Sequence, residues 1–502
     1  MLELKNLTIR LSMNDREIID NLNFVLNPGD RAVVIGEEGN GKSTLLRAIY
    51  GLNDDYCDYD GQIVAKGKLA YLPQFFPAEL LDAPLRNYFA EENLGAHARI
   101  LAQLSLSAEF LDSQRPIRTL SGGEKIKIQL ARILMAEPDI LLLDEPTNDI
   151  DIQALEWLED FIRSCRQPVL YISHDETLIE NTANVIIHLE QLIKKTKSKV
   201  SIFYGSYSEY VKRRGLAFDK QLQVAKKQRS DHRAQMERWR QIYDKVDHAQ
   251  RDITRQDASG GRLLKKKMKA VKSTGRRLER QSGDFLDIPQ MEEAIVAGFD
   301  PKIGVPRGKM VLELSLPGLF VGERQLTNAV NLTIAGPERI GIIGTNGVGK
   351  STLLREIWRS LKDRRDITAA YMPQNYREVL DYEQPVLDFL APNSNKADIT
   401  KARTYLGGMK FTRDEMTGKI GRLSGGQKAK ILFLDMVLRG ANVLILDEPT
   451  RNFSPLSAPE IRRTLNEFNG AIISISHDRK YLSEVCQKVY RLAENGLSLH
   501  II

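Results

Sequence analysis

The stretch GEEGNGKSTLLR at residues 36–47 is the strongest indication of the fold class of this chain. Its glycines, lysine and serine have the spacing of a phosphate-binding loop, in which backbone N–H groups and a lysine surround phosphate oxygens. An apolar run precedes it at residues 31–35 and a helical pattern follows it, which is the strand–loop–helix context that such a loop needs. The stretch returns as GTNGVGKSTLLR at residues 344–355, 308 residues (344 − 36) further on. The sequence therefore contains two phosphate-binding loops.

The rest of the block repeats in the same order. YLPQ, LSGGEK, LLLDEPT and ISHD, which begin at residues 71, 120, 141 and 172, return as YMPQ, LSGGQK, LILDEPT and ISHD, which begin at 371, 423, 444 and 475. In both copies apolar runs alternate with helical patterns, which predicts a parallel sheet with crossover helices. These runs are Arg31–Ile35, Ile140–Leu143, Val169–Ile172, Arg339–Ile343, Val443–Leu446 and Ala471–Ile475. We expect two copies of one α/β domain, residues 1–200 and 308–502, with a linker at 201–307.

Each copy carries residues suited to binding a nucleotide triphosphate and a metal ion. The loop lysine reaches β- and γ-phosphate oxygens in such sites, and the serine after it binds Mg²⁺. An acidic pair follows an apolar strand further on, where the Asp can hold the metal and the Glu can polarise water. The residues in question are Lys42, Ser43, Asp144 and Glu145 in the first copy, and Lys350, Ser351, Asp447 and Glu448 in the second.

With a glutamine after a short strand, an LSGG signature and a histidine 30 residues past the Asp (174 − 144; 477 − 447), these motifs resemble those of ATP-binding-cassette ATPases. Two such domains around a long basic helical linker resemble the ABC-F family specifically. The resemblance implies two tandem ABC ATPase (P-loop NTPase) domains joined by a long antiparallel α-helical hairpin. It also implies a monomer in which the two domains pair head to tail.

This pairing implies two composite ATP sites, each with the loop of one copy and the signature of the other. In the first site, ATP would bind at Gly36, Glu37, Glu38, Gly39, Asn40, Gly41, Lys42, Ser43, Thr44 and, from the second copy, Ser424, Gly425 and Gly426. In the second site it would bind at Gly344, Thr345, Asn346, Gly347, Val348, Gly349, Lys350, Ser351, Thr352 and, from the first copy, Ser121, Gly122 and Gly123.

The resemblance also assigns the catalytic and metal-binding roles. Glu145 or Glu448 would be the general base for water, and His174 or His477 would contact the γ-phosphate. Gln74 or Gln374 would sense the metal and the water. Mg²⁺ would be held by Ser43, Gln74 and Asp144 in one site, and by Ser351, Gln374 and Asp447 in the other.

Two departures from the family pattern make the sites unequal. Asp151 lies seven residues past the metal-binding Asp of the first copy, in the segment after DEPT that we call the D-loop, but Ser454 holds the same place in the second copy. The family often stacks adenine on an aromatic residue. Phe320, 24 residues before Gly344, is a candidate for this or a core residue, whereas Ser12 stands 24 residues before Gly36.

The linker is predicted to form a helical hairpin. Residues 205–247 and 262–290 read as two long helices with a turn at 257–261. Apolar residues at coiled-coil spacing form the expected seam, namely Met236, Trp239, Ile242, Val246, Leu264, Met268, Val271 and Leu278. A helix of some forty residues is about 60 Å long, so we expect the hairpin to project beyond the domains.

The net charge of +6 hides an uneven distribution. Residues 211–280 contain 22 Lys and Arg against 8 Asp and Glu, a net charge of +14. Such a density near the tip of a hairpin favours contact with RNA phosphates over a merely solvated face. The candidate RNA-binding residues are Arg251, Arg255, Arg262, Lys265, Lys266, Lys267, Lys269 and Lys272.

The family resemblance implies the ribosome as partner, with the linker in the E site near the P-site tRNA and the peptidyl-transferase centre. The string TRNFSPLS at residues 450–457 resembles members that protect ribosomes from antibiotics. A housekeeping translation factor is the alternative, and an ATPase subunit of a membrane transporter is a further one that leaves the basic hairpin unexplained. No membrane helix or signal peptide is evident, so we expect a cytoplasmic protein. Cys57, Cys165 and Cys486 suggest neither a disulfide frame nor a zinc site.

Overall fold

The structure of this chain is a computed structural model that describes residues 1–12, 15–52, 55–192, 197–252, 258–281, 285–289, 298–393 and 395–500. Residues 208–291 form one compact unit, and residues 1–207 with 292–502 form the other. The larger unit contains both copies of the repeated α/β domain, which we call the first and second cassettes. The α/β fold class with two tandem domains and a helical hairpin is confirmed.

The first cassette is built around a six-stranded sheet of order β5-β6-β7-β3-β8-β9, in which only β9 runs antiparallel to its neighbour. A three-stranded antiparallel sheet of order β2-β1-β4 accompanies it. The strands are β1 (Leu2–Leu11), β2 (Arg16–Leu26), β3 (Arg31–Ile35), β4 (Cys57–Ala65), β5 (Leu69–Leu72), β6 (Ile140–Leu143), β7 (Val169–Ile172), β8 (Val185–Gln191) and β9 (Lys197–Tyr204). The helices are α1 (Lys42–Tyr50), α2 (Leu85–Tyr88), α3 (Ala98–Gln103), α4 (Ala108–Leu111), α5 (Gly122–Met135), α6 (Ile152–Ser164) and α7 (Glu176–Thr182).

The second cassette repeats this plan with the sheet order β15-β16-β17-β14-β18-β19, of which β19 is antiparallel. Its strands are β10 (Met310–Leu316), β11 (Leu319–Val321), β12 (Arg324–Thr327), β13 (Val330–Ala335), β14 (Arg339–Ile343), β15 (Ala369–Met372), β16 (Val443–Asp447), β17 (Ala471–Ile475), β18 (Lys488–Ala493) and β19 (Gly496–His500). Its helices are α11 (Lys350–Leu361), α12 (Val386–Leu390), α13 (Lys396–Gly408), α14 (Arg413–Thr417), α15 (Gly425–Leu438), α16 (Ala458–Asn466) and α17 (Arg479–Val485).

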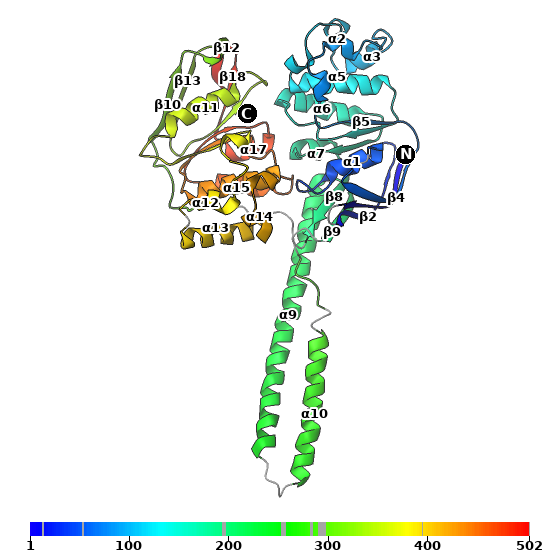
Figure 1. Ribbon diagram of the computed structural model, residues 1–502, viewed down its shortest axis with the longest axis vertical. Helices are drawn as coiled ribbons and strands as arrows, with labels where there is room; N and C mark the ends of the chain where they lie inside the picture. The colour runs from blue at the N-terminus through cyan, green and yellow to red at the C-terminus, as the bar shows by residue number, and fades with distance from the viewer. Residues whose placement is uncertain are drawn as a thin grey trace. The chain divides into compact units, whose positions relative to one another are not determined.

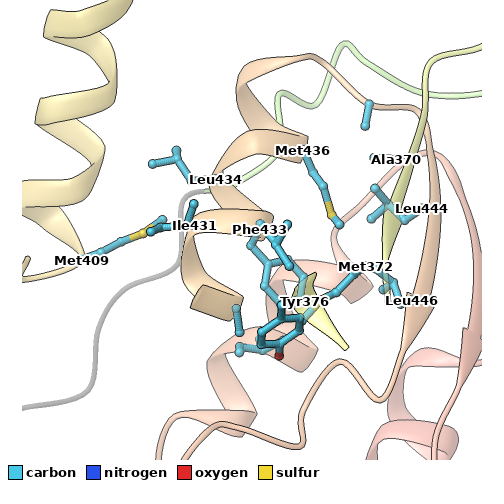
Figure 2. Packing of buried hydrophobic residues seen from close by; sticks show 14 of the residues in the cluster. Ala370, Met372, Tyr376, Met409, Ile431, Phe433, Leu434, Met436, Leu444 and Leu446 are labelled. Carbon is cyan, nitrogen blue, oxygen red and sulfur yellow. The ribbon is translucent and has the colours of Figure 1, made fainter. Parts of the chain in front are cut away.

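The central strands are buried on both faces, as parallel strands covered by helices must be. In β6 and β7 every residue is buried, which explains why the sequence there is a continuous apolar run. In the second cassette, Phe433 and Met436 of α15 share one buried cluster with the strand residues Met372 and Leu446 (Figure 2). This packing holds the signature helix of the second cassette, α15, against its own sheet.

The hairpin consists of α9 (Tyr207–Asp252) and α10 (Ala258–Gln281), which lie side by side (Figure 1). The 46 residues of α9 make it about 69 Å long. The first helix thus ends later than the predicted residue 247, and the second begins before and ends well short of the predicted 262–290. The predicted turn at 257–261 is wrong, because Gly260 and Gly261 already belong to α10. Residue 257 lies outside the described residues.

The seam between α9 and α10 follows the prediction except at one position. Met268 and Leu278 are buried, and the indole Nε1 of Trp239 donates to the carbonyl of Val271 at 2.8 Å. Ile242 was placed in the seam wrongly, because it is 52% exposed. Its neighbour in sequence, Tyr243, packs against Trp239 instead, with ring centroids 5.4 Å apart. Tyr243, and not Ile242, therefore lies on the same side of α9 as Trp239.

No helix in the described part of the chain has the length and apolar character to cross a membrane.

Candidate functional site

Each phosphate-binding loop joins a buried strand to a helix. In the first cassette, Gly36, Gly39 and Gly41 all have positive φ, and Gly41 caps α1 in the left-handed conformation. A side chain at Gly36 would collide with the carbonyl of Leu189, since its Cβ would lie 2.3 Å from that oxygen. The glycines are thus required by the path of the backbone. Gly344, Gly347 and Gly349 repeat this geometry in the second cassette.

The loop lysines turn back on their own loops. Lys42 Nζ donates to the carbonyls of Gly36 at 2.9 Å and Glu37 at 3.1 Å. Lys350 Nζ donates in the same way to Gly344 at 2.8 Å and Thr345 at 3.1 Å. Both lysines are buried. A phosphate anion would offer these ammonium groups a stronger acceptor than a neutral carbonyl.

The serine of each loop meets the metal-binding Asp predicted for it. Ser43 Oγ donates to Asp144 Oδ1 at 2.9 Å, and Tyr71 OH donates to Asp144 Oδ2 at 2.9 Å. Ser351 also bonds to Asp447. Burial raises the pKa of both carboxyls to about 6. A buried carboxylate with a hydroxyl beside it is an oxygen donor set that suits Mg²⁺, whose charge would favour the ionised form.

The two predicted general bases lie at the ends of β6 and β16 in strained conformations. Glu145 has φ 47° and Glu448 has φ 52°, values that non-glycine residues seldom adopt. Such strain persists where the surrounding structure holds the residue in place, and it is frequent at active sites. Both carboxylates face the cavity described below.

The surroundings of Glu145 stabilise its ionised form. Gln74 Nε2 and Asn148 Nδ2 donate to Glu145 Oε2 at 2.7 and 2.8 Å, and His174 Nε2 lies 3.3 Å from Oε1. Burial would raise the pKa of Glu145, but His174, Lys42 and Asn148 together lower it to about 2. Gln74 thus contacts the predicted general base directly. His174 Nδ1 also bonds to the carbonyl of Phe453 in the second cassette at 2.8 Å.

Glu448 is held differently, although it occupies the same place in the repeat. Its Oε2 accepts from the backbone N–H of His477 at 3.2 Å, and its Oε1 is buried without a hydrogen-bond partner among the described residues. Burial raises the pKa of Glu448 to about 7, and the charges of Lys350 and Arg451 offset only part of this effect. Burial likewise lowers the pKa of His477 to about 4. Arg451 stands where the first copy has Asn148, so Glu448 has no amide donor at this position.

The second loop and the first signature share one cavity of about 1980 Å³. Of the predicted second-site residues it is lined by Thr345, Asn346, Gly347, Val348, Gly349, Lys350, Ser351, Thr352, Gln374, Asp447, Glu448 and His477, with Ser121 and Gly122 of the first cassette. Gly344 and Gly123 are not among the lining residues. The Cβ of a side chain at Gly123 would meet α6, at 2.8 Å from Ala154.

Phe320 is 49% exposed on β11 and is not among the residues that line this cavity, although its neighbour Val321 is. Stacking of a base on Phe320 stays a prediction.

The first loop meets the second cassette directly instead of facing this cavity. Glu38 Oε2 accepts from the backbone N–H of Gly426, the third residue of the predicted Ser424–Gly426 set, at 2.5 Å. Glu37 accepts from the hydroxyls of Ser454 and Ser457. Burial opposes ionisation of Glu37, but Lys430 and these hydroxyls hold its pKa below the usual value. The composite pairing of loop and signature is therefore present, with carboxylates in the contact.

Sequence reasoning missed the residues that join the cassettes behind the sites. Arg462 of α16 pairs with Glu176 of α7 at 2.5 Å, and Lys480 lies 2.9 Å from the same carboxylate. Arg479 pairs with Glu159 of α6 at 2.8 Å. Glu176 and Arg479 each lie two residues past a predicted catalytic histidine. This position beside the site was the one feature of the sequence that could have drawn attention to them. Because the first copy has an acidic residue where the second copy has a basic one, the repeat gave no indication that these positions contact the other cassette.

The predicted RNA-binding residues lie on the hairpin. Arg262, Lys265, Lys266, Lys267, Lys269 and Lys272 are all exposed on α10. Arg251 is exposed near the end of α9, where it pairs with Asp247 at 2.6 Å. Arg255 lies outside the described residues.

Comparison with known proteins places these features in a family. Residues 19–148 and 327–451 match the family described as "ABC transporter". ABC transporter F family member 2 of Arabidopsis thaliana is 26% identical over 539 residues, which cover 96% of this chain and 75% of that protein. The probable ATP-binding protein YheS of Escherichia coli K12 is 28% identical over 536 residues, or 98% and 78% of the two chains.

Among solved structures, the chain resembles the archaeal ribosome recycling factor aABCE1, solved in complex with the ribosomal stalk protein aP1. The TM-score is 0.60 at 17% identity, and the match covers 98% of this chain and 89% of that one. At this identity the similarity shows a shared fold.

Proposed function

Because this chain belongs to the ABC-F family of proteins with tandem ATP-binding cassettes, we propose that it is an ATPase that binds the ribosome in its ATP-bound state. Residues 1–200 and 308–502 would bind and hydrolyse ATP, and residues 201–307 would contact RNA. The observation that carries the proposal is the exposed basic face of α10, in a protein whose other motifs all serve nucleotide binding. An ATPase subunit of a membrane transporter would leave this face unexplained.

Hydrolysis at the second site uses the residues around the cavity. Lys350 and the backbone N–H groups of its loop bind the phosphates of ATP, and Ser121 and Gly122 cover them from the first cassette. Ser351 and Asp447 would hold Mg²⁺, which when bound neutralises charge on the β- and γ-phosphate oxygens.

Glu448 accepts a proton from the attacking water at this site. The neutral His477 lies beside it and donates to the γ-phosphate. The first site has the same groups in Lys42, Ser43, Asp144, Glu145 and His174. The closed, ATP-bound form would bind the ribosome more tightly than the open form. This difference in binding free energy would drive the conformational change of the ribosome.

RNA binding rests on the cations of α10. Lys265, Lys266 and Lys267 are exposed, and none of them has a carboxylate partner among the described residues. Such cations release counterions when they meet phosphates, which makes binding strong and dependent on salt. The ABC-F family and the shared fold with a ribosome recycling factor favour the ribosome as the source of this RNA. The hairpin would then lie in the E site, near the P-site tRNA and the peptidyl-transferase centre.

Ribosome binding is tested by co-sedimentation. Glu145→Gln/Glu448→Gln removes both general bases, which typically slows turnover by about 10²–10⁴-fold. With ATP and at low salt, we expect this variant to pellet with ribosomes. Lys42→Ala/Lys350→Ala, which loses the phosphate-binding lysines, is the matched control and stays in the supernatant. If the double-glutamine variant also stays there, the ribosomal proposal is wrong.

We further propose that the purpose of binding is protection of the ribosome from antibiotics that occupy the peptidyl-transferase centre. The D-loop string that begins at Thr450 supports this through its resemblance to protective members. Cells that express the protein would then survive higher concentrations of such drugs than cells that express the Lys42→Ala/Lys350→Ala variant. Equal susceptibility, with ribosome binding intact, would favour a housekeeping translation factor.

A further inference from the structure

We infer that Glu38 takes the place of the terminal phosphate of ATP at the first site, so that this site closes on the second cassette without a triphosphate. The inference deepens the proposed function and rests on it, because it names which nucleotide the first site prefers. Its starting point is the 2.5 Å hydrogen bond that the carboxylate of Glu38 accepts from the backbone N–H of Gly426.

The place that Glu38 occupies is an anion site. Ser424 caps α15, a helix of 14 residues whose first N–H groups and dipole attract negative charge. A Cβ at Gly425 would lie only 3.0 and 3.2 Å from the two oxygens of Glu38, so the carboxylate sits directly on the glycines. Lys428, one turn into α15, adds a positive charge that interacts with Glu38. An outer phosphate on a nucleotide bound at Lys42 would need these same groups.

Glu37 holds the loop in this position. It accepts hydrogen bonds from Ser454 Oγ at 2.8 Å and from Ser457 Oγ, and its Oε2 lies 3.8 Å from Lys430 Nζ. Both hydroxyl groups are on serines that are 2% exposed. An Asp at position 454 would place a second carboxylate against Glu37. The serine in this D-loop therefore complements the acidic loop of the other cassette.

The second site has the opposite arrangement. Thr345 and Asn346 stand where Glu37 and Glu38 stand in the repeat, and Asn346 Nδ2 donates to the carbonyl of Asp149. No carboxylate from this loop reaches the first signature among the described residues. Ser121 and Gly122 border the cavity together with Lys350. The second site thus leaves its anion site open for a phosphate, whereas the first fills it with its own side chain.

Two anions cannot share the N–H of Gly426. ATP at the first site has to displace Glu38, whereas ADP is one phosphate shorter and leaves the carboxylate in place. We therefore expect the first site to bind ADP at least as well as ATP and to stay closed on it. The second site, which has no such competitor, is the one that distinguishes the two nucleotides.

The test is a nucleotide titration of the full chain with fluorescent ATP and ADP analogues. Lys350→Ala removes the second site, and Glu38→Asn then gives the first loop the residue that the second loop carries. In Glu38→Asn, the carboxylate no longer competes with the terminal phosphate for the N–H of Gly426. Because a hydrogen bond to a charged group is strong, we expect the affinity for ATP to increase roughly 10–100-fold and the affinity for ADP to change little. The mirror variant, Asn346→Glu in a Lys42→Ala background, weakens ATP at the second site relative to ADP.

The ratio of ATP to ADP affinity decides the outcome. If Glu38→Asn leaves this ratio unchanged, or lowers it, the inference is wrong, while ribosome sedimentation of the double-glutamine variant still supports the proposed function. If the first site binds neither nucleotide before or after the substitution, the inference is also overturned. An altered melting profile would show that Glu38→Asn misfolds. Glu38→Gln, which keeps the shape of the side chain, would then replace it, and the ratio of ATP to ADP affinity would be measured in the same way.

Discussion

Arg462 is expected to contribute far more to stability than its neighbour Arg463, although both pair with glutamates. Arg462 is 3% exposed, and it bonds to Glu176 of the first cassette at 2.5 Å and to Glu484 at 2.7 Å. Arg463 lies one residue further along α16, is 59% exposed, and pairs with Glu460 and Glu467 on the surface. The two arginines therefore form a matched pair that differs in burial.

The expected effect follows from what each substitution leaves behind. Removing one partner of a buried ion pair costs about 3–5 kcal/mol, because the other charge stays buried. In Arg462→Ala, Glu176 keeps Lys480 at 2.9 Å, so we expect the lower end, about 3 kcal/mol. Surface pairs are screened by water, and Arg463→Ala is expected to change stability little.

Thermal unfolding of the full chain measures this difference. A domain of 150–250 residues loses about 2–4 °C of melting temperature per kcal/mol, so Arg462→Ala lowers the first transition by roughly 6–12 °C. Arg463→Ala leaves that transition where it is in the unmodified protein. Equal shifts in the two variants would contradict this prediction, since burial would then have no part in the effect. Replacing the whole cluster with apolar residues is expected to restore much of the loss.

Three further predictions concern other parts of the molecule. The pKa of Glu448 near 7 means that its carboxylate fraction increases roughly tenfold from pH 6 to pH 8, so kcat/KM for ATP of Glu145→Gln rises with pH over this range. Glu448→Gln, which relies on the low pKa of Glu145, shows a flat profile, and two parallel profiles would contradict the prediction. Gly275→Ala places a Cβ 2.7 Å from the Trp239 ring and is expected to speed amide hydrogen exchange in α10. Gly261→Ala, with open space around the new Cβ, is expected to slow exchange in the same helix. A change of exchange rate in the same direction in both variants would contradict this prediction. Neutralising Lys265, Lys266 and Lys267 lowers the slope of log binding constant against log salt by about 0.7–0.9 per lost phosphate contact, and an unchanged slope would mean that these lysines only face solvent.

The apolar strands show how much local sequence can determine. Of the six runs predicted from the sequence, five have the bounds that the structure shows, and β16 is one residue longer. The reason is that parallel strands covered on both faces must be continuously apolar, so their pattern does not depend on distant residues. Helix ends in the linker were predicted less well, since Gly260 and Gly261, which usually indicate a turn, lie in the first turn of α10. A glycine costs a helix only about 1 kcal/mol relative to alanine, so the two glycines do not end the helix by themselves.

The contacts of the candidate site could also be expected from the sequence only in part. The family resemblance assigned Ser43 and Asp144 to one metal ion, and Gln74 and Glu145 to one water molecule. The structure brings both pairs into contact, because loops at the ends of neighbouring parallel strands meet at one edge of the sheet. The resemblance did not indicate that Glu145 and Glu448 differ in pKa. That difference depends on burial, which dominates at Glu448, and on His174, Lys42 and Asn148, which together outweigh burial at Glu145.

The amino-acid sequence alone predicts two nucleotide-binding cassettes and one basic hairpin in this chain, because motif spacing and charge density are properties of short segments. The sequence also indicates that the two sites are unequal, since Ser454 stands where the first copy has Asp151. How the sites differ in their contacts depends on the tertiary structure. Glu38 is 388 residues from Gly426 in the chain, and Glu176 is 286 residues from Arg462. Contacts over such separations depend on how two folded domains meet, and no local pattern contains that information.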